Sequence, residues 1–430
     1  MSVSSGTAPQ RSGYFLSITI IGSLFFIFGF ITWANSQLIP YLRIACELTV
    51  SQSFLVATAF FAAYFFMAIP SSYILSKTGF KKGMSLGLFV MALGAILFVP
   101  AAYSRSYPLF LTGLFVIGTG LALLQTASNP YVTVLGPIES AAQRISIMGI
   151  CNKIAGILAV FILGGIVLSN ADEFTARLAT LNAAERVAEL DALALRVVNP
   201  YIAIAAVLTI LAIIIYFINL PEIREEEEED NSLSKGKTSI TQFPHLLLGA
   251  LGIFFYVGVE VVSYDTFTSL GETLGYPLDE ARKFPSYTGY GLLIGYVLGI
   301  IIIPKYISQR LALIVSSLLS MILVLMTVFT TGTVAIVSFA LLGFSNAMIW
   351  PAIWPLAING LGRFTKIGAA LLVMGIIGGA VIPPLYGKIA EWMGSLQTGY
   401  LVMIPCYLYI LYYALNGYRA GIRRVPVVVP

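Results

Sequence analysis

Long apolar runs separated by short polar turns dominate the chain. We count twelve such runs, at roughly 14–41, 54–77, 83–102, 107–136, 144–169, 199–220, 244–270, 285–304, 310–330, 333–361, 365–388 and 397–417. Most exceed the ~20 residues that a helix needs to cross the hydrocarbon of a bilayer. The alternation typical of strands is missing, so the pattern predicts an all-α integral membrane protein with twelve transmembrane helices.

The polar connection at 221–243 divides these runs into two sets of six. It contains five consecutive glutamates followed by Asp230, a self-repelling composition typical of a flexible linker. We therefore expect a six-helix bundle over 1–220, a cytoplasmic linker over 221–243 and a second six-helix bundle over 244–430.

The two halves also echo each other. Gly118 precedes Pro130 by twelve residues in the fourth run, and Gly343 precedes Pro355 by twelve in the tenth. At the shared offset Gln125 matches Trp350, and Asn129 matches Trp354. A repeat with interrupted helices in matching places is typical of transporters whose site lies between the halves, so we expect two pseudo-symmetric bundles.

The stretch QTASNPYVTVLG at 125–136 is the strongest departure from the apolar pattern. Unpaired amides and hydroxyls cost several kcal/mol in hydrocarbon, so these groups must face protein or a wet cavity. One interpretation is a helix kinked at Pro130 whose polar groups pair with neighbouring helices. The other, which we favour, is a helix that lines a substrate pathway.

Composition agrees with a membrane protein. The chain is 58% hydrophobic and 10% charged, with a mean hydropathy of +0.90, whereas soluble chains are about 25% charged. The net charge of +4 follows from loop lysines and arginines and requires no nucleic acid. Cys46, Cys151 and Cys406 lie far apart and fit no metal spacing, so we expect free thiols and no metal.

The distribution of Lys and Arg predicts the orientation. With both termini inside, fifteen of the 24 basic residues face the cytoplasm and eight face outward, with Lys153 inside a span. This bias favours cytoplasmic termini in the cell inner (plasma) membrane. No cleavable signal peptide is visible, so the first run should remain as a helix.

The outer connection at 170–198 reads as an amphipathic helix on the outer surface. Leu178, Leu181, Leu190 and Leu193 share one side, with Arg and Glu interleaved. A solvated helical loop without function is the simpler interpretation, and we prefer it.

The chain resembles the major facilitator superfamily, and more closely the glucose/galactose transporter branch of its fucose:proton symporter family. The resemblance rests on FFIFGFITWANSQLIPYL at 25–42, GLALLQTASNPYVTVLGP at 120–137, ICNKIAG at 150–156, FYVGVEV at 255–261, and the stretch from NAMIWPAIWP to VIPPLYG at 346–387. It covers nearly the whole chain and both halves. It implies a sugar carrier that alternates between inward-open and outward-open states.

Two departures from the family pattern bear on the coupling ion. The superfamily signature after the second run survives only as Gly79, Lys81 and Lys82, with Ser76 near the expected acid. The fucose symporter pattern has a glutamate at the position of Gln125 and an acid near 35–37, where this chain has amides. Amides do not titrate, so another acid carries a proton, or the ion is sodium; we lean to sodium and keep both open.

Sugars are bound by amides and carboxylates that fix hydroxyls and by aromatic faces against the ring. Within the runs that line the cavity in the superfamily, we expect substrate contacts from amide and aromatic side chains: Gln125, Asn129, Asn152, Trp33, Asn35, Gln37, Tyr264, Asn346, Trp350 and Trp354. For Gln125 an interhelical hydrogen bond is the alternative, and for the tryptophans it is simple packing. Asn35 and Gln37 are expected near the outer mouth.

Charged residues inside the runs are few. Lys153 either snorkels to the inner interface or, as we prefer, faces the cavity, where it donates to sugar, pairs with an acid or replaces a coupling cation. Glu260 is the one acid deep in hydrocarbon and is expected to contact substrate, titrate or bind a cation. Asp265, one turn further, is expected at the outer mouth. Glu260, Asp265 and Lys153 are the candidates for cation coupling.

We therefore expect a secondary active symporter of a monosaccharide, glucose or galactose, driven by a monovalent cation (Na+ or H+), without cofactor or catalytic site. No phosphate-binding glycine loop occurs, so ATP is not the direct energy source. We expect a monomer in the lipid bilayer. The alternatives are a multidrug or metabolite exporter of the same fold and a non-transporting sugar sensor; an intramembrane enzyme is disfavoured because convergent catalytic groups are missing.

Overall fold

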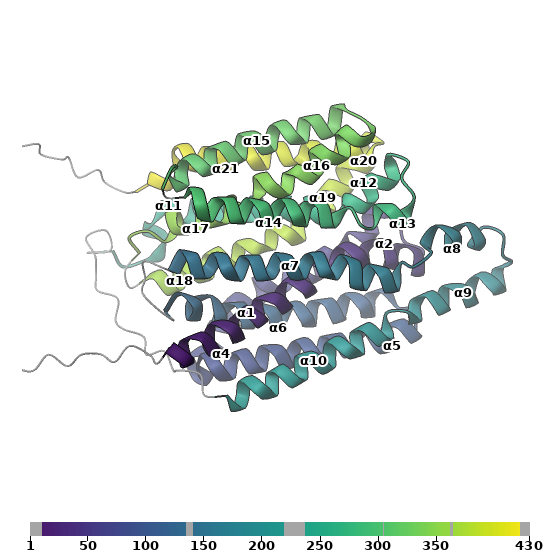
Figure 1. Ribbon diagram of the computed structural model, residues 1–430, viewed down its shortest axis with the longest axis horizontal. Coiled ribbons are helices and arrows are strands. Elements are labelled where there is room, and N and C mark those ends of the chain that lie inside the picture. The colour runs from purple at the N-terminus through teal and green to yellow at the C-terminus, as the bar shows by residue number, and fades with distance from the viewer. Residues whose placement is uncertain (1–10, 135–140, 219–236, 304, 362–363, 422–430) are drawn as a thin grey trace, which may run out of the picture.

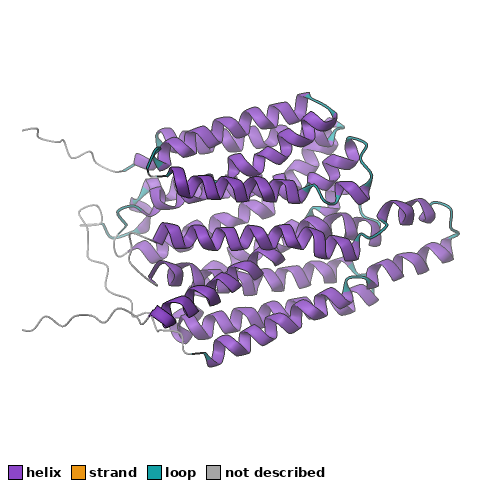
Figure 2. Cartoon of the chain, in the orientation of Figure 1, coloured by secondary structure: helices purple, strands orange, loops and turns teal. Residues whose placement is uncertain are grey.

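The computed structural model describes residues 11–134, 141–218, 237–303, 305–361 and 364–421, with the side chains of a few further residues left out. All regular structure within these ranges is helical (Figure 2). Twelve stretches are long and apolar enough to cross a membrane. The prediction of an all-helical protein with twelve spans is confirmed.

The first half of the chain contains ten helices within the described residues. They are α1 (Arg11–Trp33), α2 (Asn35–Ala45), α3 (Val50–Ser53), α4 (Leu55–Ile96), α5 (Phe98–Tyr103), α6 (Tyr107–Val134), α7 (Ala141–Val167), α8 (Ala171–Leu178), α9 (Ala183–Leu195) and α10 (Val198–Phe217).

The second half contains longer helices joined by short ones. They are η2 (Ile240–Gln242), α11 (Pro244–Asp265), α12 (Phe267–Thr273), α13 (Leu278–Ala281), α14 (Pro285–Ile302), α15 (Gln309–Phe329), α16 (Gly332–Asn346), α17 (Ile349–Ile358), α18 (Thr365–Met374), η4 (Gly375–Ile377), α19 (Gly378–Met393), α20 (Leu396–Gly399), η5 (Tyr400–Val402), α21 (Met403–Leu415) and η6 (Gly417–Arg419).

The long helix α4 contains two spans joined by a sharp turn. Gly79 has φ 73° and ψ 170°, a left-handed conformation that glycine adopts without steric cost. The break falls within the GFKKG sequence at 79–83, between the apolar runs predicted at 54–77 and 83–102, so its two lysines lie at the turn between two spans.

The helices run side by side along the long axis of the molecule (Figure 1). Helices α15, α16 and α21 lie at one edge, α4 and α10 at the other, and α7 and α14 pack against each other between them. Helix α4 also contacts α18 and α19. Pairs of helices from the two halves therefore form the centre of the bundle.

Both chain ends leave from the same end of the bundle. Helix α1 begins and α21 ends opposite the end that carries α8, α9 and α13 (Figure 1). We call the latter the outer end, because the distribution of Lys and Arg predicts that it faces outward.

Glycines permit close helix packing between α1 and α7. A Cβ at Gly29 would lie 1.9 Å from the carbonyl oxygen of Asn152, and one at Gly156 would lie 2.5 Å from the Trp33 ring. Small residues at such crossings let backbones approach in membranes, where dispersion contacts replace the hydrophobic effect between helices. This packing brings Trp33 and Asn152 together.

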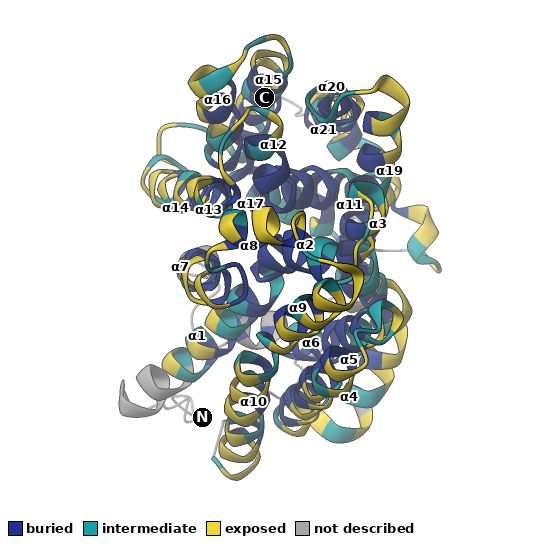
Figure 3. Cartoon of the chain, turned by 90° about the vertical axis from the view of Figure 1, so that its right-hand side faces the viewer, coloured by how far each residue is buried: buried dark blue, intermediate teal, exposed yellow. Residues whose placement is uncertain are grey.

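Exposed residues lie along the outside of the bundle and buried residues in its interior (Figure 3). Many of the exposed side chains on the sides of the bundle are large and apolar. Phe66, Ile69, Phe217 and Phe329 are each more than 60% exposed. In water such a surface would be unfavourable, so it is suited to contact with lipid.

The connection at 170–198 forms two helices rather than the expected one. Helix α8 ends at Leu178, and α9 starts at a capping box in which Asn182 and Glu185 satisfy each other's backbone N–H groups. The two helices project from the outer end (Figure 1). Helix α9 then leads almost directly into α10, so the sixth span is preceded by an extramembrane extension.

Candidate functional site

A buried ion pair joins the two halves at the centre of the bundle. The Lys153 ammonium of α7 lies 3.0 Å from Oε1 of Glu260 on α11. The two residues are only 6% and 8% exposed. Charges so far from water require a partner, and each supplies one to the other.

Trp33, at the end of α1, forms one wall around this pair. The Lys153 ammonium lies 4.2 Å from the centroid of its ring, within the range of a cation–π interaction. Its indole Nε1 donates to Oδ1 of Asn152 at 3.1 Å, and its ring packs on Tyr264 with centroids 4.3 Å apart. We call Trp33, Asn152, Lys153, Glu260 and Tyr264 the central cluster.

The central cluster combines the groups that polyhydroxylated ligands require. Lys153 offers N–H donors, Glu260 offers carboxylate acceptors, and the half-buried Asn152 offers an amide. Trp33 and Tyr264 offer aromatic surface. All five were candidates from sequence, and the structure brings them together across the two halves.

A second aromatic group lies on α17 beside α11. Trp350 and Trp354 stack with centroids 5.4 Å apart, and Trp350 also packs near Tyr256, with centroids 6.2 Å apart. Tyr256 is one helical turn before Glu260, so α11 connects this pair to the central cluster. Both tryptophans are only half-buried, which leaves part of each ring free for a ligand.

Asn346 is fully buried and already bonded within the protein. The Tyr407 hydroxyl donates to its Oδ1 at 2.8 Å, and its Nδ2 lies 3.5 Å from Ser263 Oγ. Its role in this arrangement is to join α16, α11 and α21, although it shares a neighbourhood with Trp350.

Gln125 makes the interhelical hydrogen bond that was the alternative to a substrate contact. Its Nε2 donates to the Tyr64 hydroxyl at 3.1 Å, which links α6 to α4 within the first half. Gln125 remains half-buried. The side chain of Asn129 lies outside the described residues, so its expected contact with the substrate stays a prediction.

Three polar residues expected at the outer mouth are buried. Asn35, Gln37 and Asp265 are 1%, 0% and 2% exposed. Gln37 Nε2 donates to the carbonyl of Arg282 at 2.9 Å, across the halves. Burial does not contradict a place at the outer mouth, because contacts between the two halves close that end in this conformation. The place of these residues at the mouth stays a prediction.

Those contacts form what we call the outer closure. The Arg43 guanidinium of α2 lies 2.7 Å from both carboxylate oxygens of Glu272 on α12. The Asp172 carboxylate of α8 accepts from the backbone N–H groups of Leu278 and Asp279 at 2.8 Å each. In return, the Asp279 carboxylate accepts from the backbone N–H of Ala171 at 3.3 Å.

Sequence reasoning missed the four side chains of the outer closure: Arg43, Asp172, Glu272 and Asp279. A signal was available for two of them, because Asp172 and Asp279 lie in the first turns of short helices, where carboxylates are favoured. Their cross-helix pairing joins elements more than 100 residues apart and has no local signature.

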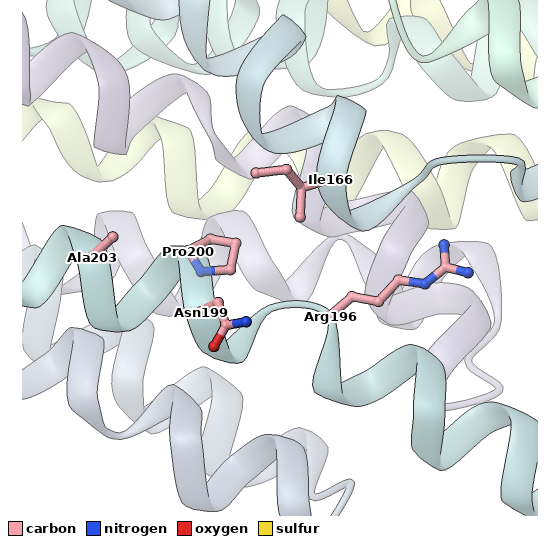
Figure 4. Close-up of a pocket in the computed structure, with 5 residues that line it drawn as sticks. All are labelled: Ile166, Arg196, Asn199, Pro200 and Ala203. Atoms are coloured by element: carbon pink, nitrogen blue, oxygen red, sulfur yellow. The ribbon is translucent and has the colours of Figure 1, made fainter.

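A hollow of about 460 Å³ lies elsewhere, between α7 and α10 (Figure 4). Ile166, Arg196, Asn199, Pro200 and Ala203 line it. Nearby Ile162 and Ile202 are 50% and 45% exposed, which places the hollow on the lipid-facing side rather than at the central cluster. Arg196 is held by a bond to the Ser169 carbonyl at 2.8 Å.

Known proteins resemble this chain along nearly its whole length. A family model described as Major Facilitator Superfamily matches residues 21–383. A glucose/galactose transporter of Brucella abortus biovar 1 is 36% identical over 423 residues, 96% of this chain and 97% of that protein. An L-fucose-proton symporter of Escherichia coli K12 is 31% identical over 413 residues, 95% of this chain and 94% of that protein.

A solved structure has the same architecture. The crystal structure of FucP, a Major Facilitator Superfamily transporter in the outward conformation, matches with a TM-score of 0.72 and 29% identity. The match covers 94% of this chain and 99% of that one.

Twelve helices with a polar cluster between two halves define a membrane carrier rather than an enzyme. The chain belongs to the Major Facilitator Superfamily, and within it to the family that contains the glucose/galactose transporters and the L-fucose-proton symporters.

Proposed function

We propose that the chain is a proton-coupled symporter that imports a monosaccharide, glucose or galactose, by alternating access. The observation that carries the proposal is the buried Lys153–Glu260 pair between the halves, with Trp33 and Asn152 against it. A ligand held there contacts both halves at once, so its binding can bias how they are arranged.

The choice of sugar rests on relatives and on chemistry. The 36% identical protein of Brucella abortus is named a glucose/galactose transporter, as is, putatively, a protein of Helicobacter pylori strain J99 that is 31% identical over 415 residues. Hydroxyl groups of a pyranose suit the ammonium, carboxylate and amide of the central cluster, while its C–H face suits Trp33.

The mechanism follows from competition within the cluster. Sugar hydroxyls accept from Lys153 and donate to Glu260, and replace part of the ion pair without leaving either charge unpartnered. Trp33, fixed through Asn152, orients the ring of the sugar. The halves then rock about the site, and the outer closure opens in one state and forms in the other.

Two arrangements of one fold support this cycle. The matched FucP structure is described as outward, whereas the outer end of this chain is held shut by Arg43–Glu272 and by the reciprocal Asp172 and Asp279 contacts. Alternating access requires that the same chain visit both.

The coupling ion differs from the one that the sequence favours, which is sodium. The name of the Escherichia coli relative, L-fucose-proton symporter, favours the proton instead. The Glu260 carboxylate is also occupied by Lys153, which leaves it unsuited to hold sodium as well.

We also propose the remaining organisation. Residues 1–220 and 244–430 form the two bundles, the segment 221–243 links them in the cytoplasm, and the chain works as a monomer in the plasma membrane with both termini inside. A single copy supplies every residue of the central cluster, which is consistent with a monomer.

Uptake of labelled glucose and galactose into proteoliposomes tests the function. An inward proton gradient should drive accumulation of one of these sugars, and a sodium gradient at equal pH should not. Accumulation driven by sodium alone would overturn the proton assignment. If neither gradient moves glucose, galactose or fucose, and none of them exchanges across the membrane, the sugar assignment is wrong.

A further inference from the structure

Asp265, the last residue of α11, is a buried acid that the central cluster does not use. It is 2% exposed, and its Oδ1 has no hydrogen-bond partner. No basic side chain in the described part of the chain forms an ion pair with it. Glu260, five residues earlier, has Lys153 at 3.0 Å.

The surroundings of Asp265 supply no counter-charge. Several titratable side chains lie on the outer parts of α11 and of the elements packed against it. They are Tyr256, Glu260 and Tyr264 of α11, Tyr41 and Arg43 of α2, Glu272 of α12, Tyr287 and Tyr290 of α14, Tyr386, Lys388 and Glu391 of α19, and Tyr400 of η5, which bonds to Thr266. Arg43 is engaged by Glu272, and Lys388 is exposed.

Other buried polar atoms of this region are also unpartnered. The hydroxyls of Tyr264 and Thr268, neighbours of Asp265 in the chain, are buried without hydrogen bonds in the described structure, as are both amide atoms of Asn35 on α2, a helix that contacts α11. Since Thr266 bonds to Tyr400 at 2.9 Å, the backbone around Asp265 is fixed while the carboxyl itself is not. The region is therefore polar but holds no charge that would stabilise a carboxylate.

Burial of an unpaired carboxylate in this region costs much more free energy than burial of the neutral carboxylic acid. Glu260 and Asp265 thus differ in kind: the first is buried as an anion with its cation, the second as a neutral carboxyl.

Asp265 lies at the outer end of α11, and the chain continues from it into the outer closure. The chain leaves Asp265 through α12, which carries Glu272, and reaches α13, where Asp279 and Leu278 meet Asp172. Tyr264, its neighbour, packs on Trp33 of the first half. Separation of the halves at this end would break these contacts and admit water to the carboxyl.

We propose that Asp265 is the proton-binding group of the carrier, and that its protonation permits the outer end to close. The inference rests on the proposed symport. With the outer end open, a proton from the outer solution adds to the carboxylate and forms the O–H bond. Closure buries the neutral acid, and the O–H bond breaks when the proton passes to water on the inner side.

The direct test measures closure rather than transport. Spin labels at Glu173→Cys on α8 and Glu280→Cys on α13, two exposed sites on different halves, report the width of the outer end. The background carries alanine at Cys46, Cys151 and Cys406. We expect a short distance at about pH 5.5 and a shift to longer distances at about pH 8.5, because deprotonated Asp265 opposes burial.

Asp265→Asn should keep the short distance at both pH values, because an amide is neutral throughout. Asp265→Glu should restore the pH dependence, and Glu391→Gln, an exposed acid on α19, should leave it as in the unsubstituted protein. Acid acting instead on the carboxylates of the outer closure would open it at low pH, the opposite sign. Either that sign, or an unchanged pH response in Asp265→Asn, overturns the proposal.

Transport supplies the second measurement. A gradient of about one pH unit supports about tenfold accumulation if one proton enters per sugar. Asp265→Asn should lose this accumulation while sugar exchange across the membrane stays within about twofold of the unsubstituted protein. Exchange by the variant also shows that it folds. Proton-driven accumulation by Asp265→Asn would overturn the proposal and leave the symport itself intact, whereas loss of all sugar movement in the unsubstituted protein would refute the symport.

Discussion

Lys153 and Glu260 come from different halves of the chain, and each tolerates burial only because the other neutralises it. Sequence alone identified both as rare charges inside spans and left pairing with an acid open for Lys153. The sequence does not show that they pair with each other. They are 107 residues apart, and hydrophobic periodicity does not say which faces of two separate helices pack together. For the same reason, the sequence does not show that Asp265 lacks a basic partner.

Loss of one partner of this pair should destabilise the protein. Glu260→Gln leaves the Lys153 ammonium buried without a carboxylate, which we expect to cost about 3–5 kcal/mol. The thermal midpoint in detergent and sugar exchange in proteoliposomes should both fall.

Replacement of both partners separates stability from function. Lys153→Met combined with Glu260→Met removes both charges, so we expect the thermal midpoint to recover while sugar exchange stays absent. Exchange by the double variant would show that the ion pair is structural and does not bind the sugar.

Cys46 should react slowly with thiol reagents. Burial raises the pKa of its thiol from 9.0 to about 11, and the nearby Arg105 offsets only part of this. The thiolate is the reactive form, so at neutral pH its population falls about a hundredfold below that of an unshifted thiol.

Maleimide kinetics on a variant with alanine at Cys151 and Cys406 measure this. The rate should increase about tenfold for each pH unit up to about pH 10. Unfolding in detergent should raise the rate to that of a free thiol. A rate equal to that of a free thiol at pH 7 would contradict the assignment.

At the scale of elements, the short helices α8 and α13 cap each other across the two halves. Each helix presents an acid in its first turn, and each acid accepts from the backbone of the other helix. Such bonds neutralise exposed N–H groups at helix starts, where the helix dipole also favours carboxylates.

Asp172→Ala should shift the carrier toward an open outer end. Loss of a capping carboxylate costs about 0.5–2 kcal/mol, which is a change of about two- to thirtyfold in the equilibrium. The spin-label pair on α8 and α13 should show the longer distance at a fixed pH. Asp191→Ala provides the control, since its partner Arg105 lies in the same half; an equal shift there would argue against a specific contact.

Elements were predicted well where the pattern was long and apolar. All twelve spans appear, and the chain turns at Gly79, between the runs predicted at 54–77 and 83–102. The pattern at 170–198 predicts one helix, although the Asn182–Glu185 capping box marks a second helix start within it. The apolar periodicity continues across this capping box, because α8 and α9 both carry buried leucines, and it therefore hides the break between the two helices.

At the scale of the whole molecule, an even number of spans returns the chain to the side from which it began. We expect both termini in the cytoplasm. A fluorescent protein fused after Pro430 should fluoresce, and alkaline phosphatase fused there should be inactive. The reverse result would invert the assignment of the outer end, and with it the direction of proton entry.

The fold as a whole followed from sequence more fully than its conformation did. Counting apolar runs and matching Gly118–Pro130 to Gly343–Pro355 led to two halves around a site. The burial of Asn35 and Gln37 could not be predicted, because a sequence does not state which of two arrangements of the halves is populated. The difference between them is a few polar contacts at one end of the bundle.

The Lys153–Glu260 pair has no net charge, and this determines how the carrier responds to the membrane potential. The membrane potential contributes about 2.3 kcal/mol per elementary charge per 100 mV, yet it does no work on a pair of opposite charges that move together. With Asp265 neutral in the loaded carrier, reorientation with sugar is electrically silent. The voltage then acts on the empty carrier, in which deprotonated Asp265 carries a single negative charge. A membrane potential that is negative inside drives this charge toward the outside. Sugar exchange should therefore produce no current, while net uptake should carry one positive charge inward per sugar.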